Sequence, residues 1–235
     1  MRRGMGIFGL LFTGVLLYVT AMHAAGIMVQ YPASQTVCRI TDPTPQETIS
    51  FPFAIEGTSL IAERVICYEG PDVEQNSQEP VSNTLALLIH NPETTPVYAV
   101  EVTLQSGENS YSFCGGYLPG QSRMLLVETG GAVWTTDPFF RCSGIAEPFA
   151  ENPLEPGVLG LEDVDMGTVA VTNTGGEAME GIRLYYKNYL PGTDIYLGGI
   201  TYAVEVEALT PGQTVYLQPS RYASGYSRIV LAQAK

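Results

Sequence analysis

The side chains of this 235-residue sequence that are best suited to acid–base or nucleophilic chemistry are few. It has two histidines: His23 lies in an apolar N-terminal segment, and His90 stands directly before an Asn-Pro turn. A Ser/His/Asp or Cys/His apparatus would depend on His90, yet a histidine at such a turn is typical of a structural position. The sequence contains no G-x-S-x-G elbow, P-loop or H-E-x-x-H motif. We therefore predict that the protein is not an enzyme.

The acidic residues leave two alternatives open. The 24 Asp and Glu residues offer many carboxylate pairs, so a glycoside hydrolase remains a distant alternative. The segment "GLEDVDMG" (160–167) gathers Glu162, Asp163 and Asp165, whose hard oxygens would suit Ca²⁺. An exposed acidic loop is the favoured interpretation. Because no C-x-x-C occurs and neither histidine lies in a ligand pattern, we expect no metal site and no cofactor.

The four cysteines all precede residue 150, at Cys38, Cys67, Cys114 and Cys142. An even number of cysteines in a chain outside the cytoplasm predicts two disulfides, for which three pairings exist. The sequential pairing, Cys38–Cys67 with Cys114–Cys142, is favoured because each loop then stays among neighbouring strands. Free thiols remain the alternative where the compartment lacks an oxidant.

Tyrosine is concentrated near the C-terminus, where eight of the 14 lie between residues 185 and 226. Tyrosine favours strands, so packing inside a β-domain is the simplest explanation. A second interpretation places Tyr185, which points outward from its predicted strand, with the loop residues Tyr189 and Tyr196 on a binding surface. Tyrosines with apolar rings and polar hydroxyls suit glycans and protein partners.

Composition and charge indicate which partners the protein can have and which elements position these side chains. The formal net charge is −13, and charged residues make up only 15% of the chain. A polyanion is repelled by nucleic acid and by anionic lipid head groups, so we expect no nucleic-acid partner. The 25 glycines and 16 prolines are spread along the chain, as in proteins of many short strands joined by tight turns.

The N-terminus predicts a membrane anchor. Two arginines precede residues 4–29, a stretch without a formal charge that as a helix would span about 39 Å, more than the bilayer core of about 30 Å. The arginines favour a cytoplasmic N-terminus, with the remainder outside. We assign residues 1–30 to a signal anchor and 31–50 to a tether. A cleaved signal peptide is the alternative, although neither Met22/Ala24 nor His23/Ala25 forms a good cleavage site.

The chain repeats itself. When "LLIHNPETTPVYAVEVTL" (87–104) is set above "VAVTNTGGEAMEGIRLYY" (169–186), Asn91 falls on Asn173 at an offset of 82 residues. Further on, the Pro119-Gly120 corner matches the Pro211-Gly212 corner at an offset of 92. A longer hairpin in the second copy would account for the extra residues. We therefore predict two copies of one β-domain, at residues 51–150 and 151–235.

Alternating strands and Pro-Gly turns define the expected fold. In "GIRLYYK" (181–187) Ile182, Leu184 and Tyr186 share one face, and in "TYAVEVEAL" (201–209) Val204, Val206 and Ala208 are expected to point inward. Each Pro-Gly pair predicts a type II turn with glycine at positive φ. The fold class predicted is all-β: two tandem immunoglobulin-like antiparallel β-sandwiches after an N-terminal transmembrane helix.

The segments "VAVTNTGG" and "ALTPGQTVYL" resemble the immunoglobulin-like and fibronectin-like (CARDB-type) modules of bacterial cell-surface proteins. The earlier "LLIHNPETTP" departs from that pattern because Pro, Glu and Thr replace the glycines. The resemblance implies a sandwich and a surface location, and it brings no catalytic residues. We expect a membrane-anchored binding or adhesion module for a glycan or a protein partner, or else a structural spacer of an envelope assembly.

Overall fold

The structure is a computed structural model that describes residues 47–71, 80–149, 153–155 and 157–234. Residues 46–235 form one compact unit, and the predicted anchor and tether lie almost entirely outside the described residues. Every regular element of the described part is a β-strand, so the predicted all-β class is confirmed. None of the described segments is a helix long and apolar enough to cross a membrane.

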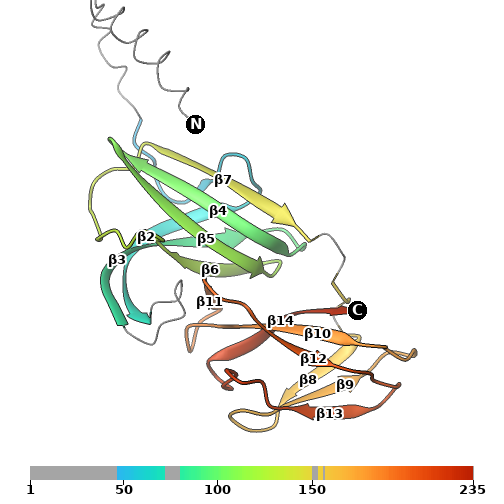
Figure 1. Ribbon diagram of the computed structural model, residues 1–235. Helices are drawn as coiled ribbons and strands as arrows, with labels where there is room; N and C mark the ends of the chain where they lie inside the picture. Colours follow the sequence, from blue (N-terminus) through green and yellow to red (C-terminus); the bar gives the residue numbers. More distant parts are fainter. Residues whose placement is uncertain (1–46, 72–79, 150–152, 156, 235) are drawn as a thin grey trace, which may run out of the picture. The chain divides into compact units, whose positions relative to one another are not determined.

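The first half of the described chain consists of two antiparallel sheets packed face to face (Figure 1). One sheet has the order β1-β2-β3-β6 and continues into β11 (Ile195–Leu197), whereas the other has the order β5-β4-β7. The bounds are β1 (Phe53–Ala54), β2 (Ile61–Pro71), β3 (Pro80–Asn91), β4 (Val97–Ser106), β5 (Asn109–Leu118), β6 (Ser122–Val127) and β7 (Arg141–Pro148).

Alternation along the strands builds the core between these two sheets. On β3, Leu85, Leu87 and Ile89 point toward the facing sheet, where β4 contributes Val100 and Val102. These side chains are buried, and burial of a Leu or Val side chain stabilises a fold by about 1.5–3 kcal/mol. The intervening residues of β3 belong to a separate apolar cluster on the outer face of the same sheet.

The second half repeats the same strand order, and all its strands except β14 are shorter than their counterparts. One sheet has the order β13-β9-β8 and the other β12-β10-β14, so β8, β9 and β13 correspond to β2, β3 and β6. The bounds are β8 (Leu159–Asp163), β9 (Val169–Asn173), β10 (Ile182–Asn188), β11 (Ile195–Leu197), β12 (Tyr202–Val206), β13 (Thr214–Leu217) and β14 (Ser227–Ala234). A core that includes Val171, Leu184 and Val206 lies between the two sheets.

The extra residues of the second half lie where the repeat analysis predicts them. A two-residue turn joins β4 to β5, whereas residues 189–201 separate β10 from β12 and contain β11. β11 pairs in parallel with β6, with Ile195 opposite Arg123 and Leu197 opposite Leu125 (Figure 1). Leu190, Ile195 and Leu197 also pack against the outer apolar cluster of the first half. This segment of the second half thereby becomes the fifth strand of a first-half sheet.

One inward-facing residue was predicted wrongly. Val204 and Val206 pack in the second core as expected, but Ala208 is exposed and Leu209 is buried instead. β12 ends at Val206, and Leu209 then forms an isolated antiparallel bridge with Met179. The alternation therefore stops where the strand stops.

Candidate binding surface

A bulge in the ladder between β4 and β7 lies at an aromatic cluster on the surface of the described chain. Val97 pairs with Leu118 and Ala99 with Gly116, and Tyr98 is an extra residue relative to β7. Across from Tyr98, Tyr117 has φ 54°, a left-handed conformation that bulky residues rarely adopt. Bulges of this kind turn a side chain out of the regular ladder, and Tyr98 is 43% exposed.

Four rings from three strands and one loop form this cluster. Tyr98, Tyr117 and Phe149 each lie 5.4 Å from the other two by ring centroid, with steeply inclined planes. Tyr185, from β10, lies 4.6 Å from the Tyr117 ring at 36°. Inclined pairs at such distances are favourable because the positive edge of one ring faces the negative face of another. We name Tyr98, Tyr117, Phe149 and Tyr185 the aromatic cluster.

A surface ion pair gives the cluster polar groups. Arg183 Nη2 donates to Glu205 Oε1 at 2.6 Å, and both side chains are about half exposed. Hydrogen bonds to Glu205 and then to Tyr185 raise the pKa of Arg183. Burial, followed by the neighbouring Tyr185, raises the pKa of Tyr117 to about 12. Aromatic faces beside fixed donors and acceptors can bind sugar rings or the apolar side chains of a protein.

The three tyrosines predicted to form a binding surface are all half-buried and have partners within the chain. Tyr185 belongs to the aromatic cluster, but the other two do not. The ring of Tyr189 lies beneath the Arg228 guanidinium, 4.1 Å from its carbon, and Tyr189 forms an isolated bridge with Tyr196. Tyr196 packs against the first core beside β6, and burial raises its pKa.

The repeated asparagines have structural roles, of which Asn91 shows the first. This residue is fully buried at the end of β3. Its Nδ2 donates to Thr95 O at 2.9 Å and to Pro119 O at 3.3 Å, and its Oδ1 accepts from Glu93 N at 3.1 Å. One amide thereby joins the turn that follows β3 to the corner that precedes β6.

Asn173 repeats this arrangement in the second half, where it is again fully buried. Its Nδ2 donates to Glu177 O at 2.7 Å and to Leu209 O at 3.0 Å, and its Oδ1 accepts from Gly175 N at 2.9 Å. The bonded residues within the turn lie two and four positions after the asparagine in both halves. The repeat found in the sequence therefore extends to individual hydrogen bonds.

The two Pro-Gly corners differ from each other. Gln213 N donates to Thr210 O at 3.0 Å, and Gly212 has φ 75°, as the predicted type II turn after Pro211 requires. After Pro119 the prediction is wrong, because the positive φ of 55° belongs to Gln121. Gly120 is required for a different reason: a Cβ there would clash with the backbone carbonyl of Thr94.

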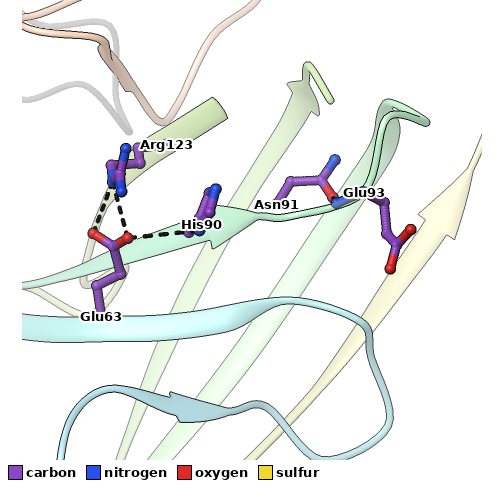
Figure 2. A network of polar contacts seen from close by, with 5 residues as sticks. All are labelled: Glu63, His90, Asn91, Glu93 and Arg123. Carbon is purple, nitrogen blue, oxygen red and sulfur yellow. Dashed lines mark hydrogen bonds and ion pairs between the residues drawn. The ribbon is translucent and has the colours of Figure 1, made fainter. Parts of the chain in front are cut away.

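His90 belongs to a polar network on the outer face of the first half (Figure 2). Arg123 Nε lies 2.9 Å from each carboxylate oxygen of Glu63, and His90 Nδ1 lies 3.7 Å from Glu63 Oε1. The three residues come from the adjacent strands β2, β3 and β6, and Arg123 also lies opposite Ile195 of β11. The network therefore lies beside the place where β11 attaches, and His90 faces a carboxylate that is already paired.

The acidic loop at the start of the second half uses its carboxylates within the fold. Asp163 accepts hydrogen bonds from Tyr222 Oη at 2.6 Å and Ser224 Oγ at 2.7 Å. Asp165 accepts from Gly167 N and Thr168 Oγ1, and these bonds lower its pKa. Among the described residues, no group of three or more His, Cys, Asp or Glu side chains is arranged to hold a metal ion.

The structure does not contain the second bridge of the favoured pairing, Cys114–Cys142, because Cys142 is a free thiol. Cys114 and Cys142 lie on the two strands that flank β4, opposite Glu101 and Leu104 respectively. Two strand spacings alone amount to about 9.5 Å, the three-residue offset along β4 adds to this, and a disulfide requires Cα atoms within about 7 Å. Burial raises the pKa of the Cys142 thiol to about 12.

The first predicted bridge, Cys38–Cys67, stays a prediction because Cys38 lies outside the described residues. Cys67 is exposed on β2, where its Sγ lies 3.5 Å from Asn83 Oδ1.

Sequence reasoning missed Tyr98, Tyr117, Phe149 and Arg183. A signal for two of them was present, since Tyr98 and Tyr117 stand two residues from Pro96 and Pro119, beside turns that were recognised. Nothing local indicated that Tyr185 would meet them, because it lies 68 positions after Tyr117 in the chain.

Comparison with known proteins gives no relative on which to base a function. No family model, no curated protein and no solved structure matches this chain.

Proposed function

We propose that this protein is a non-catalytic binding module, anchored in a membrane by residues 4–29, that presents two tandem immunoglobulin-like β-sandwiches to a glycan or protein partner outside the cytoplasm. The observation that carries the binding role is the aromatic cluster. Its member Tyr98 is turned outward at a bulge of β4, and its member Tyr185 lies beside Arg183 of the Arg183–Glu205 pair.

Three features support the remaining parts of the proposal. The matching strand order and the matching asparagine bonds support two copies of one module, as in the bacterial surface modules that the turn motifs resemble. The non-catalytic assignment is supported by His90, which contacts Glu63 rather than a nucleophile. The charge-free segment after two arginines supports the anchor.

Substitution of Tyr98 tests the binding role. Full-length protein in detergent micelles is applied to a glycan array and to an array of envelope proteins, and each hit is compared with Tyr98→Ala. We expect at least a tenfold loss of affinity with a change in Tm below about 3 °C, because the side chain is substantially exposed. Tyr216→Ala, at another exposed tyrosine, is the matched control and keeps its affinity. Equal binding by Tyr98→Ala would exclude the aromatic cluster as the binding site.

Mass spectrometry of the protein from its native membrane tests the anchor. An intact N-terminus supports a permanent anchor, whereas a chain that begins near residue 25 would make the protein secreted.

The alternative function is a structural spacer of an envelope assembly, and the attachment of β11 favours it. A spacer must keep its two modules in a fixed relation, and β11 places a strand of the second half in a sheet of the first. If Tyr98→Ala binds every partner normally while disruption of β11 abolishes assembly, the spacer role is the correct one.

A further inference from the structure

A groove of about 780 Å³ lies between the turns of the first half and the open side of the second. Its walls are the turn at residues 94–96, the corner at 119–121, the edge strand β8 and the edge strand β14. This volume falls within the 300–1,000 Å³ that is usual for binding clefts. The aromatic cluster contributes no residue to the lining, so the groove is a separate site.

The groove runs along the outer edge of β14, with which no strand of the described residues pairs. β14 is paired on one side with β10, and on its other side Leu154 N donates to Ala232 O at 2.8 Å. This bond shows that one outward carbonyl of β14 accepts a backbone N–H from another segment. Ile229 and Val230 continue the edge along the groove beyond that bond. An exposed strand edge is a template for the addition of another strand.

The lining favours an apolar occupant with basic ends. Its side chains are mostly apolar, with Leu161 at 44% exposed, and Glu155 is the single charged residue among those that line the groove. The whole chain carries a formal net charge of −13. A second copy of the chain would bring an equal negative charge to the same edge, whereas a basic segment is attracted to it.

We propose that this groove binds an extended segment of a partner protein, apolar at alternate positions and flanked by lysine or arginine, which adds as a strand to the open edge of β14. The backbone hydrogen bonds of β14 supply affinity, and the apolar lining that includes Leu159 and Leu161 selects apolar side chains. This inference rests on the proposed function, because it assumes that the protein is a binding module. It uses residues other than the aromatic cluster, so the two sites can fail independently.

A library of synthetic nonapeptides tests the proposal with full-length protein in detergent micelles. We expect the selected peptides to alternate apolar residues between basic ends and to bind with saturable micromolar Kd. N-methylation of alternate backbone amides should abolish binding, because it removes the donors of the strand ladder.

Three variants locate the site. Leu161→Lys, which places a positive charge in the groove, should weaken peptide binding at least tenfold, and Glu155→Gln should weaken it several-fold. Val133→Lys is the matched control, since Val133 is 65% exposed and is not a lining residue. Tyr98→Ala should bind the peptides normally, which separates this site from the aromatic cluster.

Each contrary outcome overturns the proposal. Selection of acidic peptides, equal binding by Leu161→Lys, or full binding of the N-methylated peptides would each exclude strand addition at this groove. A dimer that Leu161→Lys dissociates would show that a second copy occupies the groove instead.

Discussion

In each half of the described chain, the side-chain amide of one buried asparagine joins two segments that are distant in the sequence. Asn91 and Asn173 each satisfy one backbone N–H and two backbone carbonyls without exposing any surface. Buried polar groups of the backbone must find such partners, because an unpaired one costs free energy. A serine or leucine could not replace asparagine here, since neither provides two donors and an acceptor in one plane.

We predict that Asn91→Ala and Asn173→Ala each lower the free energy of unfolding by about 2–3 kcal/mol, because several backbone groups lose their partner. Urea denaturation followed by circular dichroism measures the change. Asn109→Ala, at an exposed position in the β4–β5 hairpin, is the control and should cost less than about 0.5 kcal/mol. Equal costs at the buried and exposed asparagines would contradict the structural role.

The thiols should differ in reactivity. Cys142 is buried and its pKa is raised to about 12, so at pH 8 iodoacetamide should leave it unmodified until guanidinium unfolds the protein. Cys67 is exposed and should react in the native state. Peptide mass spectrometry measures both. If Cys67 reacts only after reduction, it is bridged, as predicted for Cys38; modification of native Cys142 would contradict its burial.

Strand β11 connects the second half of the described chain to the first. It is three residues long, yet it pairs with β6 and covers part of the outer apolar cluster. Without it, the edge of β6 and the apolar face beside it would be open, a combination that promotes aggregation. The Glu63–Arg123 pair lies next to this attachment and fixes the side chain opposite Ile195.

We predict that Leu197→Asp separates the unfolding of the two halves. The variant places a carboxylate against the outer apolar cluster and loses the partial burial of a leucine, whose full burial would be worth about 1.5–3 kcal/mol. Differential scanning calorimetry should then resolve two transitions where the unmodified protein shows one. Ile200→Asp, at an exposed residue just outside β11, should keep a single transition; one transition in both variants would mean that β11 does not couple the halves.

For the whole molecule, ionisation of buried tyrosines limits stability at high pH. The pKa of Tyr117 is raised to about 12, and burial also raises the pKa values of Tyr186, Tyr196 and Tyr222. In the unfolded chain these groups ionise near pH 10. Above that pH the unfolded state releases protons that the folded state retains, so ionisation favours unfolding.

We therefore predict that the free energy of unfolding is unaffected by Tyr117 below about pH 10 and falls between about pH 10 and pH 12. Urea titrations at half-unit intervals of pH measure the fall. Tyr117→Phe keeps the ring in the aromatic cluster and removes the ionisable group, so its fall should be smaller. Superimposable curves for the two proteins would contradict the raised pKa.

The sequence by itself determined the features that depend on local chemistry. Period-two alternation predicted the all-β class, and the second Pro-Gly pair predicted a type II turn because glycine tolerates positive φ. The repeat predicted where the extra residues lie, and Asn91 and Asn173 were aligned before their shared hydrogen bonds were known. These predictions hold because neighbouring residues determine strands and turns.

Only the tertiary structure decided which distant segments meet. The parallel pairing of β11 with β6, the approach of Tyr185 to Tyr117, and the position of Cys142 across β4 from Cys114 join residues that no local pattern relates. The turn at Gly120 could not be predicted from local sequence for the same reason, because the backbone of Gly120 passes close to Thr94 of another loop. Alternation assigns a side chain to one face of a sheet, but the chain's path through space determines what that face contacts.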